Sequence, residues 1–374
     1  VVMCSTKKYR RSLSRCKRCI QLLKICQHDV NKIAVFLRCF NRKVPMNLFR
    51  EAKRLNLKYL GIILVLLLIM ADIGYSRRQF LSVGTAPPGG AFFVVGSAIA
   101  QVVNDNLGDL SWQVSAEATK GTQENIRRLR NSELDFALAN AAISYFAVRG
   151  QGAWKEKYPV RVIMTLAPNV AFFITRKSSN IKKIIDLKGK RAVVGPAGAG
   201  FEYFLKPILQ AHGVSYQDFT PLHNTQLGSV DMLADGSAKA AFLGGAVPTA
   251  SIVQASASQD IFFIPFDEEA KKQLFENYPF FAPATIPANT YRNQLQPFDG
   301  MNVGSMHLVT SADVDEKKVH HFTRILYEHR HQVAKKHPAG KAINPKNIVR
   351  NTGTPFHPGA IRYYMDIGIW PKDQ

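Results

Sequence analysis

Cysteine is scarce in this sequence, and its few copies are confined to one end. All five precede Met46: Cys4, Cys16, Cys19, Cys26 and Cys39. The rest of the chain therefore needs no disulfide. The pair at 16 and 19 has CxxC spacing, but a second ligand pair at zinc-finger spacing is missing. We expect no metal site, and we interpret residues 1–45 as a basic extension that is disordered or not translated.

The sequence also lacks the motifs of common catalytic and nucleotide-binding sites. It contains no GxSxG elbow, no HExxH pair and no EF-hand loop. The segment 195–200 has the spacing GxxGxG rather than GxGxxG, and no GK[ST] is nearby, so neither a dinucleotide fingerprint nor a P-loop is indicated. Four histidines on the amphipathic stretch 314–337 are typical of a solvated helix face: His320, His321, His329 and His331. We therefore expect no cofactor.

Acidic residues are few, which gives a formal net charge of +22. The excess is concentrated near the start, because residues 1–45 hold 12 Lys/Arg and one acid, and residues 46–77 hold five and two. Residues 78–374 keep 32 basic and 24 acidic residues. This mildly basic part suits a small anionic ligand, and we expect no nucleic-acid partner.

A full-length apolar span is missing as well, since the longest apolar run covers only residues 59–71. Arg50, Lys53, Arg54 and Lys58 precede it, so residues 46–77 read as a signal anchor whose start lies in the cytoplasm. An A-x-A cleavage site is absent, which favours a retained anchor, although a cleaved signal stays open. We expect the rest of the chain to be periplasmic, tethered to or exported across the inner membrane.

Beyond residue 78, short β-rich runs alternate with helical stretches, which predicts an α/β fold with parallel strands. In four places a strand leads through a Gly- or Thr-rich loop into a helix. The four loops are residues 84–90, 119–122, 195–200 and 244–246. We expect strands at residues 80–83, 112–118, 134–139, 191–194 and 239–243, and helices from about Ala91 and over residues 201–212.

The shared chemistry of these loops predicts an anion-binding site. Gly and Thr allow tight turns and leave the first amides of each helix free, at the positive end of the helix dipole. Lys120 lies in such a loop, so it can pair with a ligand carboxylate or be exposed without a role. Glu124, Asn125 and Glu202 fit helix capping better than ligand contact. Any single loop can be Gly-rich for steric reasons alone, but four together favour a site.

The order of these motifs resembles the TAXI family of solute-binding proteins, which are associated with TRAP transporters. The resemblance covers about residues 80–368. It rests on residues 83–93 (VGTAPPGGAFF), 118–125 (ATKGTQEN), 132–138, 186–191, the turn Gly244-Gly245-x-x-Pro248, 286–291 (IPANTY) and 357–364 (HPGAIRYY). Two departures are Phe92-Phe93, where the family usually has a tyrosine, and Lys120, where a small residue is common.

The resemblance implies a type II periplasmic-binding-protein fold with a ligand cleft between two lobes, and no enzymatic activity. It also implies delivery of a glutamate-like, dicarboxylate-like or other small acid to TRAP-type permease subunits by sodium-coupled transport. Because Phe92 and Phe93 lack hydroxyls and Lys120 adds a charge, the family's ligand does not transfer directly. An enzyme on the same fold and an envelope sensor or scaffold stay open as alternatives.

We expect lobe 1 to comprise residues 78–168 and 250–374, and lobe 2 residues 169–249, with crossovers near Pro168 and at 246–250. Amides and threonine hydroxyls are expected to bind the anion, and aromatic rings to line the pocket or pack the core. The predicted ligand-binding residues are Gly84, Thr85, Gly89, Gly90, Phe92, Phe93, Thr119, Lys120, Gly121, Thr122, Asn140, Pro196, Ala197, Gly198, Gly200, Phe201, Gly244 and Gly245.

Overall fold

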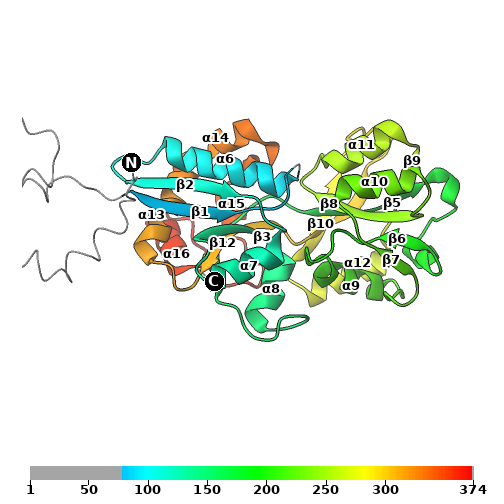
Figure 1. Cartoon of the computed structure of the whole chain (residues 1–374), viewed down its shortest axis with the longest axis horizontal. Helices are drawn as coiled ribbons and strands as arrows, with labels where there is room; N and C mark the ends of the chain where they lie inside the picture. The colour runs from blue at the N-terminus through cyan, green and yellow to red at the C-terminus, as the bar shows by residue number, and fades with distance from the viewer. Residues whose placement is uncertain (1–77, 89, 373–374) are drawn as a thin grey trace, which may run out of the picture. The chain divides into compact units, whose positions relative to one another are not determined.

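The computed structural model describes residues 78–88 and 90–372. The predicted extension 1–45, the signal anchor 46–77 and Gly89 therefore lie outside the described residues. Arg77–Gln374 forms a compact unit. Within it, the strands make two sheets, which Figure 1 shows as separate groups.

The first sheet has five strands in the order β2-β1-β3-β12-β4. β1, β2 and β3 are parallel, and β12 lies antiparallel between β3 and β4. Its strands are β1 (Gln79–Gly84), β2 (Trp112–Glu117), β3 (Phe136–Asn140), β4 (Val160–Thr165) and β12 (Met306–Ser311).

The second sheet has seven strands, with six in the order β10-β11-β5-β8-β6-β7 and β9 paired to β5. β6, β7 and β8 are parallel, whereas β5 is antiparallel to β8, β9 and β11. Its strands are β5 (Val170–Arg176), β6 (Arg191–Val193), β7 (Thr220–Leu222), β8 (Ala240–Gly245), β9 (Ile261–Ile264), β10 (Phe281–Ile286) and β11 (Phe298–Val303).

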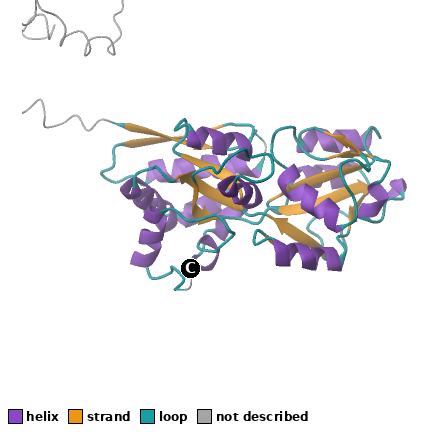
Figure 2. Cartoon of the chain, turned by 90° about the horizontal axis from the view of Figure 1, so that it is seen from below, coloured by secondary structure: helices purple, strands orange, loops and turns teal. Residues whose placement is uncertain are grey.

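Helices cover both faces of each sheet (Figure 2). The α-helices are α6 (Ala91–Asp105), α7 (Thr122–Arg130), α8 (Ala141–Arg149), α9 (Glu202–Ala211), α10 (Gln226–Ala234), α11 (Ala250–Ser258), α12 (Glu268–Asn277), α13 (Glu316–Glu328), α14 (Arg330–Lys336), α15 (Pro345–Ile348) and α16 (Pro358–Asp366). Short 3₁₀ turns are η2 (Lys177–Ser179), η3 (Ile184–Leu187) and η4 (Pro338–Ala342).

The predicted strand-to-helix units are present, and the α/β two-lobe fold is confirmed. In α6 apolar side chains that recur every three or four residues are buried: Val95, Ile99, Val102 and Val103. Phe322 of α13 stacks on Phe136 of β3 with ring centroids 4.0 Å apart, which joins this helix to the first sheet. The predicted amphipathic stretch 314–337 forms α13 and α14, with His329 at the break between them.

Two crossovers join the lobes. The chain leaves the first sheet between Thr165 and Val170 and returns between Val303 and Met306. The return was expected at residues 246–250, but these residues connect β8 to α11 within the second lobe. β9, β10 and β11 all add to the second sheet, so residues 250–303 belong to lobe 2 rather than lobe 1.

Candidate functional site

The predicted binding loops lie at the sheet edges that meet at the crossovers. β1, β2, β3 and β4 end at one edge of the first sheet, and the antiparallel β12 begins there. In the second sheet, β6 and β8 end at the corresponding edge, where β5 begins. Open α/β sheets bind ligands at the carboxyl ends of their parallel strands. The predicted loops therefore occupy the positions expected of a binding site.

Thr85 forms the centre of the first junction, where its side chain is fully buried. Its hydroxyl donates to the Glu117 carbonyl over 2.7 Å, and its own carbonyl accepts from the Thr119 hydroxyl at 3.0 Å and from Asn125 Nδ2 at 2.7 Å. The structure thus brings the predicted Thr85 and Thr119 together. Their hydroxyl protons are engaged in holding the ends of β1 and β2.

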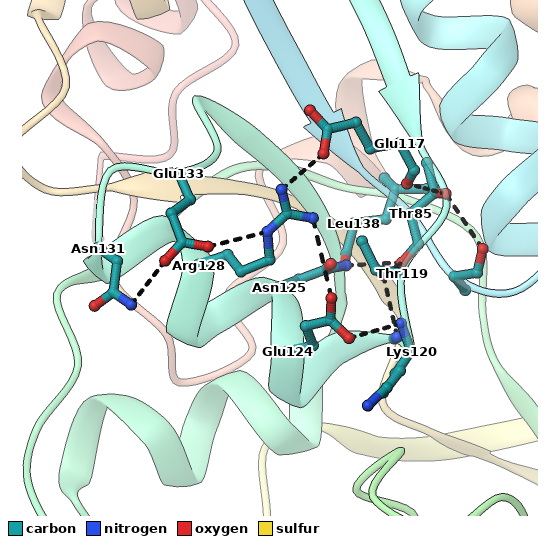
Figure 3. A network of polar contacts seen from close by, with 12 residues as sticks. Thr85, Glu117, Thr119, Lys120, Glu124, Asn125, Arg128, Asn131, Glu133 and Leu138 are labelled. Carbon is teal, nitrogen blue, oxygen red and sulfur yellow. Dashed lines mark hydrogen bonds and ion pairs between the residues drawn. The ribbon is translucent and has the colours of Figure 1, made fainter.

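In the second junction, residues 119–122, two backbone amides already have hydrogen-bond acceptors on nearby side chains (Figure 3). The amide of Lys120 donates to Glu124 Oε2 at 3.0 Å, and the amide of Gly121 donates to Thr119 Oγ1 at 3.1 Å. Glu124 therefore has the capping role that the sequence favoured. Thr122 Oγ1 accepts from the Asn140 amide at 3.0 Å, and within the described residues no acceptor takes its hydroxyl proton.

Carboxylates surround the same junction. Arg128 forms ion pairs with Glu117 at 2.7 Å, Glu133 at 3.4 Å and Glu124 at 4.0 Å. The hydrogen bond that Arg128 donates to Glu117, and then the nearby negative charges, raise the pKa of Arg128. Three carboxylates face one guanidinium, so the positive charge of the exposed Lys120 partly offsets a local excess of negative charge.

Asn140 ends β3 and caps α8. Its Oδ1 accepts from the amides of Ala142 and Ile143, while Nδ2 donates to the carbonyls of Gly304 at 2.8 Å and Val303 at 3.4 Å. This predicted ligand residue therefore ties the first sheet to the return crossover. Because its donors and acceptor are engaged, the start of α8 offers no free side-chain amide to an anion.

In lobe 2, the predicted loop 195–200 leads into α9. Phe201 packs on Phe204 and Phe242, with ring centroids 5.2 and 6.1 Å away, so it contributes to the lobe core as the alternative interpretation held. The N-terminus of α9 carries no side-chain cap. Pro196, Ala197 and Gly198 lie in the same loop, between β6 and this uncapped end.

Further predicted residues lie at the start of α6 and at the end of β8. Gly90 is the N-cap of α6, which has no side-chain cap; Phe92, partly buried, packs on the core, and Phe93 is also partly buried. Gly244, at the end of β8, exchanges two hydrogen bonds with the Gln226 side chain, at 2.8 and 3.1 Å, and Gly245 follows it.

The lobes also contact each other beside α8. Tyr203 of α9 lies 5.5 Å from Phe146 and 5.9 Å from Trp154, measured between ring centroids. A Cβ on Gly200 would come within 2.9 Å of Ile143 Cδ1 and 3.0 Å of Gln123 Cγ. The loop at the start of α9 therefore rests directly on α7 and α8 of lobe 1.

A polar cluster that the sequence did not predict lies at the crossovers. The Asn169 amide donates to Asn302 Oδ1 at 3.0 Å, and Asn302 Nδ2 donates to Ser305 Oγ at 2.9 Å. The Arg350 guanidinium also donates to Ser305 Oγ. These residues come from three separate stretches without a recognisable motif, so only their helix and strand context brings them together.

His307 lies next to this cluster and is fully buried. Its Nε2 is 2.9 Å from Thr352 Oγ1. Burial, and then the positive charge of Arg350, lower the pKa of His307 to about 3. The imidazole is therefore neutral at physiological pH and does not add a second charge to that of Arg350.

One groove of about 560 Å³ lies away from these loops, in lobe 2. It is lined by α12, β10 and β11 residues, among them Lys272, Glu276 and Asp299, and none of the predicted ligand residues lines it.

Among the described residues, no three or more His, Cys, Asp and Glu side chains are placed to share a metal ion. No helix within residues 78–372 is long and apolar enough to cross a membrane, and the run 59–71 lies outside the described part.

The two sheets and two crossovers are those of a two-lobe periplasmic-binding-protein fold. Similar solved structures include the aliphatic sulphonate binding protein SsuA from Escherichia coli, with 12% identity, 71% of this chain and 77% of that chain covered, and a TM-score of 0.41. SsuA from Xanthomonas axonopodis pv. citri bound to MOPS has 13% identity, 78% and 84% coverage, and a TM-score of 0.46. PhnD1 from Prochlorococcus marinus with methylphosphonate has 11% identity, 78% and 96% coverage, and a TM-score of 0.48. MOPS and methylphosphonate are ligands bound in those two structures.

The chain belongs to the NMT1-like family, whose profile matches residues 83–368. The match spans both lobes and both crossovers.

Proposed function

We propose that the chain is an extracytoplasmic solute-binding receptor that binds a small anionic solute between its lobes and delivers it to a membrane permease. The observation that carries this proposal is the meeting of the carboxyl ends of both sheets at two crossovers. Rotation about two adjacent crossovers is a common way to close two lobes on a ligand. Membership of the NMT1-like family is consistent with this role.

Two helix starts support an anionic ligand. α6 in lobe 1 and α9 in lobe 2 both begin without a side-chain cap. Their first amides lie at the positive ends of the helix dipoles, where an anion is stabilised. Of the predicted side chains, Lys120 and Thr122 keep a donor that a ligand can take, whereas Thr85, Thr119 and Asn140 bond within the protein.

We further propose the ligand and partner class that the family resemblance implies. The solute is a small carboxylate or amino acid, such as a glutamate-like or dicarboxylate ligand, and the partner is a TRAP-type permease of the TAXI group. The receptor acts in the periplasm, with the run 59–71 as its tether to the inner membrane.

A thermal-shift screen of carboxylates and amino acids on the full chain in detergent micelles tests the receptor role. A ligand that binds the native state raises the melting temperature by mass action. We expect stabilisation by at least one anion and weaker stabilisation of Lys120→Ala. If no anion stabilises the protein, the receptor proposal is refuted.

The rival functions predict different results. An enzyme on the same fold would convert the stabilising acid, which NMR of the recovered solute detects, whereas a receptor returns it unchanged. A sensor or scaffold would leave solute uptake intact when the gene is deleted. A TRAP-type partner predicts that uptake by the intact system stops when the sodium gradient is collapsed.

A further inference from the structure

Arg350 carries a partly buried charge without an acidic partner among the described residues. It follows the short helix α15 and donates to Ser305 at the return crossover. Among the described arginines, Arg128, Arg130 and Arg362 pair with glutamates. The sequence from residue 329 to residue 365 contains no Asp or Glu, so no neighbour along the chain supplies a carboxylate to Arg350.

Leaving such a group unpaired is costly. Burial lowers the pKa of Arg350, because it weakens the hydration of the charged form. A guanidinium nevertheless stays protonated in proteins, so the charge cannot be removed by losing a proton. An anion bound beside it would offset the desolvation cost. The planar fork of an arginine matches the two oxygens of a carboxylate or another oxyanion.

Buried neighbours hold the guanidinium in place. Ser305 and Asn302 are almost completely buried, and Asn302 connects Ser305 to the Asn169 amide. Asn169 lies on the outgoing crossover, whereas Asn302 and Ser305 lie at the return. The guanidinium is therefore positioned by both segments about which the lobes would move.

The local charge also limits how much negative charge the acidic group of a ligand can carry. His307, the nearest other basic side chain of the cluster, is neutral at physiological pH, as described above. The cluster therefore presents one positive charge and several N–H donors, which match one acidic group with a single negative charge. Arg350 differs in this from Lys120, whose junction contains three carboxylates.

We propose that Arg350 binds the acidic group of the solute through its guanidinium, and that Ser305, Asn302 and Asn169 are positioning residues for it. Carboxylates, sulfonates and phosphonates share the oxyanion chemistry that such a site recognises. This inference rests on the proposed receptor function and names the residue that anchors the ligand.

The test compares binding of four probes to the full chain in detergent micelles: sodium glutamate, succinate, methanesulfonate and methylphosphonate. Wild type, Arg350→Gln, Arg350→Lys and Arg324→Gln are measured by thermal shift and titration calorimetry. Arg324 is an exposed arginine of the same lobe and serves as the matched control. A second measurement follows phenylglyoxal modification of Arg350 and Arg324 in wild type by peptide mass spectrometry, with and without each probe.

We expect Arg350→Gln to weaken the best probe about 100-fold, because a buried charged hydrogen bond to the ligand is lost. Arg350→Lys should lose about tenfold, since the charge remains without the fork. Arg324→Gln should change affinity less than about twofold, in line with the small effect of exposed charges. The bound probe should protect Arg350, but not Arg324, from modification. The class of the tightest probe identifies the acidic group.

The failures of the two proposals are distinguishable. A probe that binds wild type and Arg350→Gln within threefold, without protecting Arg350, overturns the assignment of Arg350 and leaves the receptor role standing. If no probe binds wild type or protects Arg350, both proposals fail. If Arg350→Gln does not fold, Arg350→Lys and the protection experiment decide in the same way.

Discussion

The loop that rests on the other lobe provides a sharp test, because two of its glycines differ in one respect. Gly198 and Gly200 have φ values of 72° and 88°, in the left-handed region that disfavours a side chain. A Cβ on Gly198 meets nothing within 4 Å, whereas one on Gly200 meets Ile143 and Gln123 of lobe 1 at 2.9 and 3.0 Å. Alanine at either position has a similar backbone cost, but only Gly200→Ala disturbs the contact between the lobes.

The backbone cost is about 1–2 kcal/mol for each alanine. At Gly200 the contacted atoms are ends or middle carbons of flexible side chains, so relieving the overlap should cost about another 1–2 kcal/mol. If the free protein is mostly open and the contact forms on closure around the ligand, the additional cost falls on the bound form alone and weakens ligand binding about 5- to 30-fold. Gly198→Ala should lower stability by a similar backbone amount and leave affinity nearly unchanged.

The assay is titration calorimetry with the anion found in the screen, together with urea unfolding of both variants. Small-angle scattering with and without ligand shows whether Gly200→Ala closes less completely than Gly198→Ala. Equal affinities of the two variants would refute the reasoning, because the lobe contact would then contribute nothing to the bound state.

Two further predictions concern stability. Asn125→Ala removes two buried hydrogen bonds, to Thr85 and Leu138. It should lower the free energy of unfolding, measured in urea, by about 2–4 kcal/mol. Asn131→Ala, at the exposed end of the same helix, should change it by under about 0.5 kcal/mol, and equal losses would contradict the role of Asn125. For His307 the folded pKa of about 3 lies below the ordinary value of 6.5, so the unfolded state binds more protons between these values and stability falls as the pH drops from 6.5 towards 3, by about 1.4 kcal/mol per unit below 6. His307→Gln should remove this part of the slope between pH 7 and pH 5, measured by urea unfolding, and an unchanged slope would contradict the assignment.

The fold class and most strand-to-helix units could be predicted from the sequence, because each unit carries a local signal. An apolar strand, a Gly- or Thr-rich loop and an amphipathic helix recur, and α6, α7 and α9 begin near the expected residues. The return crossover could not be predicted this way. β9, β10 and β11 join the second sheet through long-range pairing, and nothing in residues 303–306 distinguishes them from an ordinary loop.

The ligand-binding role of the predicted site residues stays a prediction. Thr85 and Thr119 lie together at the ends of β1 and β2, but their hydroxyl protons are taken by neighbouring carbonyls, and hydrogen-bond saturation depends on geometry that composition does not record. Arg350 was missed for the same reason. It lies in a loop after a four-residue helix, and neither its burial nor the absence of an acidic partner from a distant part of the chain is apparent before the chain is folded.

The position of β12 has a consequence for how the protein is made. This strand lies between β3 and β4, yet it follows the whole of lobe 2 in the chain, and Met306 pairs with Asn140 across more than 160 residues. The first sheet therefore cannot be completed until the second lobe has been synthesised, whereas the second lobe is continuous and can fold first. Until β12 arrives, β3 and β4 each expose an unpaired edge, so the nascent chain is most open to aggregation or chaperone binding during that interval.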